Sequence, residues 1–519
     1  MNALAVLYGG SLTEAAYEQV FAGKSAFDRA VERAAAFPNT RKILLLMQDP
    51  LMRQSDLVQG VGIACIPASS WTRKQVLDTI ARESEGFDYT YVAWADCPFL
   101  DPDLAKAIAE RHLRYAAEYS YADGWPYGLA PEILGPGMGG ILAKLAGDTE
   151  DPMERDALFS VIQKDINAFD IETVISPVDL RYHRLSLAAD TKRNLLLLTR
   201  FAEAGFSCAQ DAEKIITEQP ELLRTLPNFF SIQAAGPCPQ RCTLCPYPRF
   251  QGAGDLTQRK DFLAADRFAE LLERIISFAG DGVIDLSLWG EFGLHPAKLE
   301  LIRRVLARPE LSLIIETSGL GWKTEELEQA ATEARQALPR RNRMAPLSWI
   351  ISLDAQDPER YREIRGPGYA QALATAKTLT RLFPRDAYVQ AVRVKGFEDD
   401  IEHFYRFWKE AGAASIIQKY DHFCGALPAL GAADLSPVKR QPCWHLMRDM
   451  VILLDGTVPC CREDLAALTG GTEKGILGNV FAESLPTIWD RGAVFYREQG
   501  TSAYTGICAG CDEYYTYNF

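Results

Sequence analysis

The hydrophobic pattern of residues 1–205 alternates short apolar runs with amphipathic stretches. Short apolar runs bounded by turn residues are typical of buried strands, and apolar positions three and four residues apart predict helices. The alternation indicates a parallel or mixed sheet covered by helices, with ligands at the carboxyl ends of its strands. The predicted strands are Ala3–Tyr8, Ile43–Met47, Gly62–Ile66 and Tyr89–Trp94, and the predicted helices are Ala26–Ala36 and Arg73–Arg82.

A second alternating segment covers residues 228–430 and follows a helical connector at 206–227. Its predicted helix Ala265–Ala279 carries one apolar stripe, which would pack on a sheet. Six strand–helix units fit a partial barrel better than a complete eightfold one, and catalytic residues of such barrels lie at the carboxyl ends of the strands. The six predicted strands are Phe229–Ala234, Val283–Leu288, Leu311–Glu316, Trp349–Leu353, Tyr388–Val394 and Ser415–Lys419.

Composition and charge narrow the class of protein. The 519 residues are too many for one core and suggest three domains, and a hydrophobic content of 48% favours packed domains over disorder. The net charge of −14 gives no general attraction to nucleic acid or anionic membranes. No apolar run reaches the length of a membrane span, and the first residues have no basic signal-peptide region. We therefore expect a cytoplasmic protein with neither nucleic acid nor membrane as partner.

The twelve cysteines are unevenly spaced. Cys65, Cys97, Cys208 and Cys424 are isolated, and the first three read as small buried hydrophobic residues. The other eight form two groups, at 238–245 and 443–511. In the cytosol, clustered cysteines favour metal or cluster ligation over disulfides, so the spacing predicts two metal centres.

The first group is Cys238, Cys242 and Cys245, spaced C-x3-C-x2-C after a predicted strand. A cubane iron–sulfur cluster normally takes four thiolates, so three leave one iron open for another ligand. A zinc knuckle or a disulfide pair is the alternative. The stretch resembles the radical S-adenosylmethionine (SAM) superfamily. The resemblance implies a [4Fe–4S] cluster on these three cysteines, whose open iron chelates the amino and carboxylate groups of SAM.

Further motifs follow the predicted strands in the order of that superfamily. Gly290-Glu291 resembles its G-G-E motif, with Trp289 in place of the first glycine, and Thr317-Ser318-Gly319 stands where Thr-Asn-Gly is common. Tyr361–Gly366 resembles the Y-x-x-I-R-G run of members that act on peptides. The resemblance implies catalytic roles for Glu291 and Arg393, and cofactor contacts from Gly290, Glu291, Thr317, Ser318, Gly319, Ser352 and Asp354. It also implies reductive cleavage of SAM to a 5′-deoxyadenosyl radical, with a reductant such as flavodoxin or ferredoxin.

The second group of cysteines lies in residues 431–519. A zinc ribbon is the alternative, although the adjacent pair Cys460-Cys461 and the long gap before Cys508 fit one poorly. The Asp455-Gly456 pair predicts a hairpin turn that presents the second cysteine. The segment resembles the SPASM domain of radical SAM peptide maturases. The resemblance implies one auxiliary [4Fe–4S] cluster, since the sequence ends eight residues after Cys511. The expected ligands are Cys443, Cys460, Cys508 and Cys511, with Cys461 a spare thiol or the ligand in place of Cys460.

Residues 1–205 resemble the nucleotidyltransferases that activate sugars. Gly9-Gly10-Ser11 follows the first strand, Lys24 lies further on, and Asp96 and Asp190 stand where that family places magnesium ligands. Leu12-Thr13-Glu14 replaces the arginine of the family's glycine-rich loop, and a glutamate there would repel phosphate. We therefore expect the fold without the transferase activity.

The full order resembles the spiro-SPASM group. It implies an α/β chain with a nucleotidyltransferase-like (GT-A-like) α/β/α sandwich at 1–205, a linker at 206–227, a partial (β/α)6 radical SAM barrel at 228–430 and a small SPASM iron–sulfur domain at 431–519. The leading hypothesis is a radical SAM enzyme that modifies a peptide or protein. The alternatives are radical modification of a nucleotide-linked sugar or other small molecule held by the N-terminal domain, and a non-enzymatic iron–sulfur binding or sensing protein.

Overall fold

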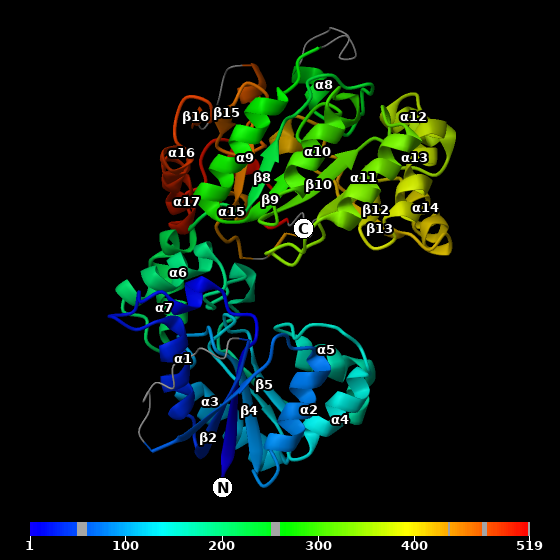
Figure 1. Cartoon of the computed structure of the whole chain (residues 1–519). Coiled ribbons are helices and arrows are strands. Elements are labelled where there is room, and N and C mark those ends of the chain that lie inside the picture. Colours follow the sequence, from blue (N-terminus) through cyan, green and yellow to red (C-terminus); the bar gives the residue numbers. More distant parts are fainter. Residues whose placement is uncertain (49–59, 251–259, 434–435, 438, 470–474, 517–519) are drawn as a thin grey trace. The chain divides into compact units, whose positions relative to one another are not determined.

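The computed structural model describes residues 1–48, 60–250, 260–433, 436–437, 439–469 and 475–516 (Figure 1). The chain forms two compact units, Met1–Leu223 and Arg224–Phe519. The segment predicted as a linker contributes helix α7 (Asp211–Glu218) to the first unit. The barrel and the cysteine-rich C-terminal segment belong to the same second unit, so the positions of their residues can be compared directly.

The first unit is a three-layer α/β/α sandwich, as the hydrophobic pattern predicts. Its seven-stranded sheet has the order β3-β2-β1-β4-β6-β5-β7, and β6 runs antiparallel to its neighbours. Helices α1 and α3 cover one face, and α2, α4 and α5 cover the other (Figure 1). The strands are β1 (Ala3–Gly9), β2 (Thr40–Met47), β3 (Gly62–Pro67), β4 (Tyr89–Trp94), β5 (Tyr119–Asp123), β6 (Glu132–Leu134) and β7 (Ile171–Ile175). The remaining helices are α1 (Ala26–Ala35), α2 (Arg73–Glu83), α3 (Pro102–Tyr115), α4 (Met138–Ala146), α5 (Ala157–Ile162) and α6 (Lys192–Glu203).

The second unit contains the predicted partial barrel. Six parallel strands, β8 to β13, alternate with helices along the chain and lie side by side in sequence order. A seventh parallel strand, β14, comes from the C-terminal segment and pairs with β8. The sheet is open, with β13 and β14 at its edges. The strands are β8 (Phe229–Ile232), β9 (Gly282–Asp285), β10 (Leu311–Thr317), β11 (Leu347–Ser352), β12 (Ala387–Arg393), β13 (Ala414–Lys419) and β14 (Asp449–Ile452).

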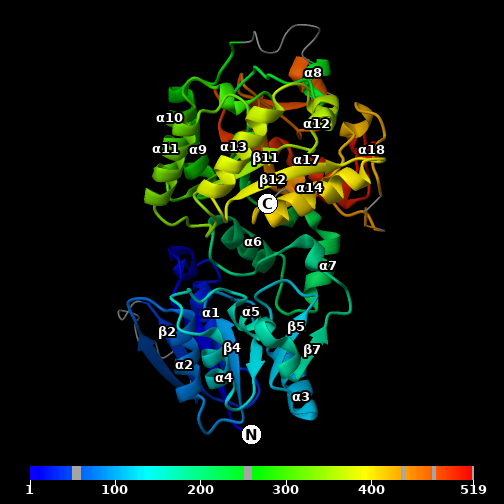
Figure 2. The ribbon, with the colours of Figure 1, turned by 90° about the vertical axis from the view of Figure 1, so that its right-hand side faces the viewer.

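Helices cover the convex face of this sheet (Figure 2). The apolar stripe of α9 is buried there, as its spacing predicts, through Phe268, Leu271, Leu272 and Ile275. Strand residues alternate between two faces, so the opposite side chains line the concave interior. The helices of the barrel are α8 (Tyr247–Phe250), α9 (Ala265–Ala279), α10 (Lys298–Leu306), α11 (Thr324–Gln336), α12 (Pro358–Arg365), α13 (Tyr369–Leu382) and α14 (Glu398–Glu410).

The C-terminal segment contains a tight turn and a separate two-stranded antiparallel sheet. The Asp455-Gly456 turn joins β14 to β15 (Thr457–Pro459), with Gly456 at a φ of 89°, and β15 pairs antiparallel with β16 (Ile476–Asn479). The turn therefore presents Cys460 and Cys461 directly after β15, as predicted. The remaining helices are α15 (Trp444–Arg448), α16 (Leu485–Arg491), α17 (Ala493–Gly500) and α18 (Ile507–Gly510). Among the described residues, no helix is both long and apolar enough to cross a membrane.

Candidate metal and cofactor sites

The loop of residues 238–245, here called the cysteine loop, follows β8 at the carboxyl end of the barrel. Two backbone hydrogen bonds anchor the loop and the turn before it. Gly236 donates to the Asp261 carbonyl at 2.9 Å, and Thr243 donates to the Ile364 carbonyl at 2.8 Å, at the end of α12. The loop is thus held between the first and fourth strand–helix units, at the edge where parallel-barrel active sites lie.

The three thiols of the cysteine loop lie near one another and are partly buried. Burial raises the pKa of Cys238 to about 12, and it also raises the pKa values of Cys242 and Cys245. Cys242 lies close enough for its charge to add to the rise at Cys238 and Cys245, whereas the Arg365 guanidinium opposes it. Thiolates bind metal, so a buried trio that resists ionisation needs a cationic centre to compensate its charge. An iron–sulfur cluster fits this donor set.

A chain of side chains supports the cysteine loop from the barrel. Arg365 donates to Asp354 Oδ2 at 2.6 Å and to Gln240 Oε1 at 3.1 Å, and the Cys242 thiol points to the same Gln240 oxygen at 3.7 Å. Gln240 also donates to the Tyr361 hydroxyl at 2.7 Å. The Tyr361–Gly366 motif and Asp354 therefore position the loop. This role for Asp354 differs from the direct cofactor contact expected from the sequence, which stays a prediction.

Glu291 lies beside the cysteine loop and is 4% exposed. Its Oε1 accepts from Gly293 N at 2.9 Å and Thr317 Oγ1 at 2.6 Å, and its Oε2 accepts from Ser318 N at 2.8 Å and Ser318 Oγ at 2.6 Å. A carboxylate offers about four lone-pair sites, so these four bonds use its capacity. Three predicted site residues thus meet around one carboxylate. That carboxylate joins the loop after β9 to the end of β10.

Two predicted glycines are required by their surroundings. Gly290 has a φ of 71°, and a Cβ there would lie 2.0 Å from the Ala235 carbonyl oxygen. Gly319 has a φ of 80°, and a Cβ would lie 3.0 Å from Ala372 on α13. Both positions need the conformational freedom of glycine. At Gly290 the close approach also brings Glu291 N to the Pro237 carbonyl at 2.8 Å, directly before Cys238.

A row of polar side chains crosses the concave interior of the barrel. Asp285 accepts from Ser231 Oγ at 2.6 Å, Glu316 accepts from Ser352 Oγ, and Gln390 Nε2 donates to Glu316 at 2.8 Å. Burial raises the pKa of Asp285 to about 6. Of this row, which we call the polar row, the sequence argument identified only Ser352. A polar residue inside each buried apolar strand was the available signal for Ser231, Asp285, Glu316 and Gln390.

Arg393 lies apart from these groups. It ends β12, and its side chain is exposed. Within the described ranges it makes no side-chain hydrogen bond or ion pair, so the structure does not bring it into the set around Glu291. Its predicted catalytic role has no structural support and stays a prediction.

The second cysteine group surrounds a separate small cavity in the C-terminal segment. We call it the auxiliary cavity. Its lining includes the thiols of Cys424, Cys443, Cys461, Cys508 and Cys511. Burial is the main cause that raises the pKa values of Cys443 and Cys461 well above normal, so these thiolates too need a cationic partner.

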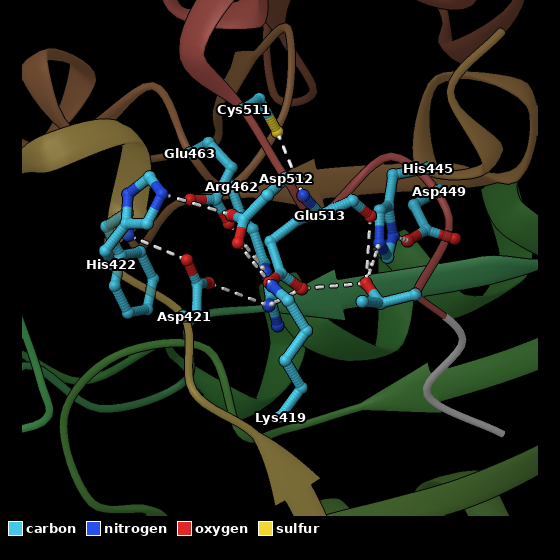
Figure 3. Close-up of polar contacts among 12 residues, drawn as sticks. Lys419, Asp421, His422, His445, Asp449, Arg462, Glu463, Cys511, Asp512 and Glu513 are labelled. Carbon is cyan, nitrogen blue, oxygen red and sulfur yellow. Dashed lines mark hydrogen bonds and ion pairs between the residues drawn. The ribbon is translucent and has the colours of Figure 1, made fainter. Parts of the chain in front are cut away.

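The auxiliary cavity changes one predicted ligand. Cys460 was the expected ligand and Cys461 the alternative to it; Cys461 lines the cavity, and Cys460 is not among the lining residues. Successive residues leaving a strand point in opposite directions, so only one of the adjacent pair faces the cavity. Cys443, Cys461, Cys508 and Cys511 are the thiols of this segment that line the cavity, so the structure favours the alternative ligand Cys461, and the ligand set stays a prediction. His445 also lines the cavity, but its ring nitrogens contact Asp449 and Thr516 (Figure 3).

The aspartates of the first unit come together, but around a guanidinium. Arg155 donates to both Asp96 oxygens, at 3.2 and 2.6 Å, and to Asp190 Oδ2 at 3.0 Å. Lys24 pairs with Glu32 on the surface and is far from fully buried, with 53% of its side chain exposed. The residues do not fit a magnesium site in this arrangement, because a cationic side chain already bridges the two carboxylates.

The chain is similar to one protein-family model and to several known proteins. A model described as an iron–sulfur cluster-binding domain, SPASM, matches residues 443–512. An uncharacterized protein of Treponema pallidum (strain Nichols) is 36% identical over 371 residues, which are 70% of this chain and 98% of that protein. Streptococcus suis SuiB bound to precursor peptide SuiA is similar over 69% of this chain and 84% of its own, at 13% identity and a TM-score of 0.41. A cytidylyltransferase from Leptospira borgpetersenii is similar over 43% of this chain and 95% of its own, at 16% identity and a TM-score of 0.35.

The near-complete cover of the Treponema pallidum protein places both chains in one family. One compact unit contains both the cysteine loop, at the carboxyl end of the partial barrel, and the matched cluster-binding domain that follows the barrel in the sequence. The chain therefore belongs to the family of that Treponema pallidum protein, and its residues 443–512 match the SPASM iron–sulfur cluster-binding domain.

Proposed function

We propose that this enzyme generates a 5′-deoxyadenosyl radical at the cysteine loop and uses it to remove a hydrogen atom from a peptide or protein. One observation carries the proposal: three neighbouring, partly buried thiols stand at the carboxyl end of a partial barrel whose concave face is polar. When bound, a [4Fe–4S] cluster with SAM supplies one-electron cleavage of the SAM carbon–sulfur bond and hence the radical.

The chain's own residues bind and orient the cofactors in this proposal. Cys238, Cys242 and Cys245 hold three irons, and Arg365 favours their thiolate forms. Glu291 fixes Ser318 and Thr317 at the end of β10, so these side chains keep one arrangement beside the loop. Gly290 and Gly319 allow the backbone to approach closely where a larger residue would collide. Such a preorganised set positions a ligand at little entropic cost.

The polar row supports a substrate rich in hydrogen-bonding groups. Asp285, Glu316 and Gln390 are buried or partly buried and hydrogen-bonded to their neighbours, so they are fixed in direction. A peptide backbone offers a donor and an acceptor at each residue and suits such a surface. The likeness of Tyr361–Gly366 to the run found in peptide-modifying members supports the same substrate class. The closed Asp96–Arg155–Asp190 cluster gives no support to metal-dependent handling of a nucleotide-linked sugar.

The experiment that tests the proposal measures 5′-deoxyadenosine. The anaerobically reconstituted full chain, with dithionite as the reductant, should convert SAM to 5′-deoxyadenosine and methionine. A variant with Cys238, Cys242 and Cys245 all changed to Ala should form none. Cys65→Ala is the matched control, because this thiol, expected to be buried, is exposed and belongs to the first unit, whereas both cysteine groups belong to the second.

Wild-type protein that holds both clusters but forms no 5′-deoxyadenosine would contradict the proposal and favour an iron–sulfur binding protein. The substrate class needs a second measurement. The Cys508→Ala chain, used as bait under anaerobic conditions, should retain peptides rather than nucleotides or sugars. When a captured peptide is deuterated and given to the wild-type enzyme, deuterium should appear in 5′-deoxyadenosine.

A further inference from the structure

The auxiliary cavity has one thiol more than a four-iron cluster requires. A cubane takes one thiolate for each iron, so Cys443, Cys461, Cys508 and Cys511 are sufficient. All four lie within the segment matched by the cluster-binding family, residues 443–512. The fifth thiol of the cavity, Cys424, lies outside that segment and follows β13 of the barrel. Its position needs a separate explanation.

The turn that carries Cys424 has an unusual backbone. Phe423 and Cys424 lie in the short 3-10 helix η7 (Phe423–Gly425) with φ values of 48° and 50°. Residues other than glycine adopt the left-handed region at a cost in strain, and such strain persists where the surroundings impose it. Here Phe423 N donates to Asp421 at 2.7 Å and Gly425 N donates to His422 Nδ1 at 2.9 Å. The turn is therefore held in the conformation that directs Cys424 to the cavity.

Ion pairs fasten this turn to the loop that carries Cys511 (Figure 3). Lys419 Nζ contacts Asp512 at 2.8 Å and also Glu513, and His422 Nε2 lies 3.4 Å from Asp512 Oδ1. The turn η7 also packs against α18, which ends at the residue before Cys511. Cys424 and Cys511 are thereby held as neighbours from two sides, and both line the auxiliary cavity.

We propose that Cys424 is a positioning residue that remains a thiol and donates its S–H to the sulfur of Cys511 when that sulfur ligates the auxiliary cluster. The Glu513 N–H already points to the same sulfur at 3.4 Å, so Cys511 would accept two hydrogen bonds. Donors to cluster sulfurs stabilise the extra negative charge of the reduced state and raise the reduction potential. The barrel thus contributes to the redox properties of the auxiliary cluster through one side chain.

This inference rests on the auxiliary cluster of the proposed function but not on SAM cleavage. The test therefore uses a full-chain background in which Cys238, Cys242 and Cys245 are Ala, so that only the auxiliary cluster remains. Cys424→Ala, Cys424→Ser and Cys460→Ala are compared in it after anaerobic reconstitution. Cys460 is the matched control because it is buried and next to a ligand but does not line the cavity. Iron content and an EPR-monitored redox titration are measured.

We expect about four iron per chain in every variant. The midpoint potential should fall in Cys424→Ala, remain near the background value in Cys424→Ser because its O–H still donates, and be unchanged in Cys460→Ala. Loss of iron in Cys424→Ala would overturn the proposal by showing that Cys424 is a ligand. An unchanged potential with full iron would overturn it by showing that the S–H has no influence. If the background chain itself holds no iron, it has no auxiliary cluster and the inference fails, independently of the result of the SAM assay.

A second and independent observation concerns the Asp96–Arg155–Asp190 cluster of the first unit. Arg155 is held over the rings of Trp94 and Tyr127, at 4.4 and 5.1 Å from their centroids, and also donates to the Tyr127 hydroxyl at 3.2 Å. Burial lowers its pKa, but the Asp96 charge more than compensates, so the pKa stays above the usual value. Both terminal nitrogens of Arg155 are hydrogen-bonded to carboxylate oxygens of the cluster, so the guanidinium remains a fixed cation.

We infer that Arg155 occupies the place of a divalent cation, so the first unit binds no magnesium. In wild type, manganese titrated as an EPR probe should show no site that depends on Asp96. Arg155→Ala should create one by freeing the two carboxylates, and adding Asp96→Ala should abolish it. Arg181→Ala is the matched control, because Arg181 is an exposed arginine paired with Asp123 and Asp179. An Asp96-dependent site in wild type, or none in a folded Arg155→Ala chain, would overturn the inference.

Discussion

Replacing Glu291 should damage the barrel as well as any SAM site. The carboxylate is 4% exposed and accepts four hydrogen bonds, two of them from the backbone N–H groups of Gly293 and Ser318. In Glu291→Ala the hydroxyls of Thr317 and Ser318 can rotate to other acceptors, but the two N–H groups cannot. A buried donor without a partner costs about 1–3 kcal/mol. The unfolding free energy of the second unit should therefore fall by about 2–6 kcal/mol.

Glu291→Gln separates geometry from charge. The amide keeps one accepting oxygen, so one backbone N–H loses its partner, and the loss should be about 1–3 kcal/mol. Glu300→Ala is the control, because Glu300 is 45% exposed and pairs with Arg304 on the surface, where such a pair contributes about 0.3–0.5 kcal/mol. Scanning calorimetry of the cluster-free chain should resolve the order wild type, Gln, Ala. The fall for Ala should be at least about 4 °C.

Binding of SAM by the reconstituted variants completes this test. If the SAM amino group replaces one of the four donors to Glu291, loss of a charge-assisted bond of about 1.5–3 kcal/mol should weaken binding roughly 10- to 150-fold. An Ala variant with wild-type stability and weaker SAM binding would refute the structural reasoning, because the four donors would then not depend on this carboxylate.

Three further predictions concern iron, backbone and pH. The reconstituted chain should hold about eight iron, and removal of the three barrel cysteines should leave about four; a value near four in wild type, with zinc present, would show that the second site is not a cluster. Gly290→Ala should lose the barrel iron while retaining the auxiliary iron, since its Cβ would lie 2.0 Å from the Ala235 oxygen; unchanged iron would contradict this. Burial lowers the pKa of His112 to about 4, so the neutral ring, bonded to Ser120 at 2.8 Å, should stabilise the first unit above about pH 6.5. That contribution should be lost, by up to about 3 kcal/mol, as pH drops from about 6.5 to about 4, and His112→Asn should remove this part of the pH dependence in urea unfolding.

The sequence by itself determined most of the fold. Period-two and period-3.6 patterns are local, so they fixed elements such as β4 (Tyr89–Trp94) and α9 (Ala265–Ala279) to the residue. The alternation of strands and helices then required parallel sheets, because parallel strands need crossover connections. The spacing of Cys238, Cys242 and Cys245 was also local information, since three thiols within one loop must lie close together.

Only the tertiary structure decided which distant residues share a site. The direction of a side chain after β15 selected Cys461 over Cys460, and the return of the chain after β13 brought Cys424 to the auxiliary cavity. Arg155 and Asp96 are 59 residues apart, and nothing in their local sequence indicates that one neutralises the other. Glu316 and Gln390 meet only because β10, β11 and β12 are adjacent. Contacts between residues far apart in the chain depend on packing and direction, which no local pattern encodes.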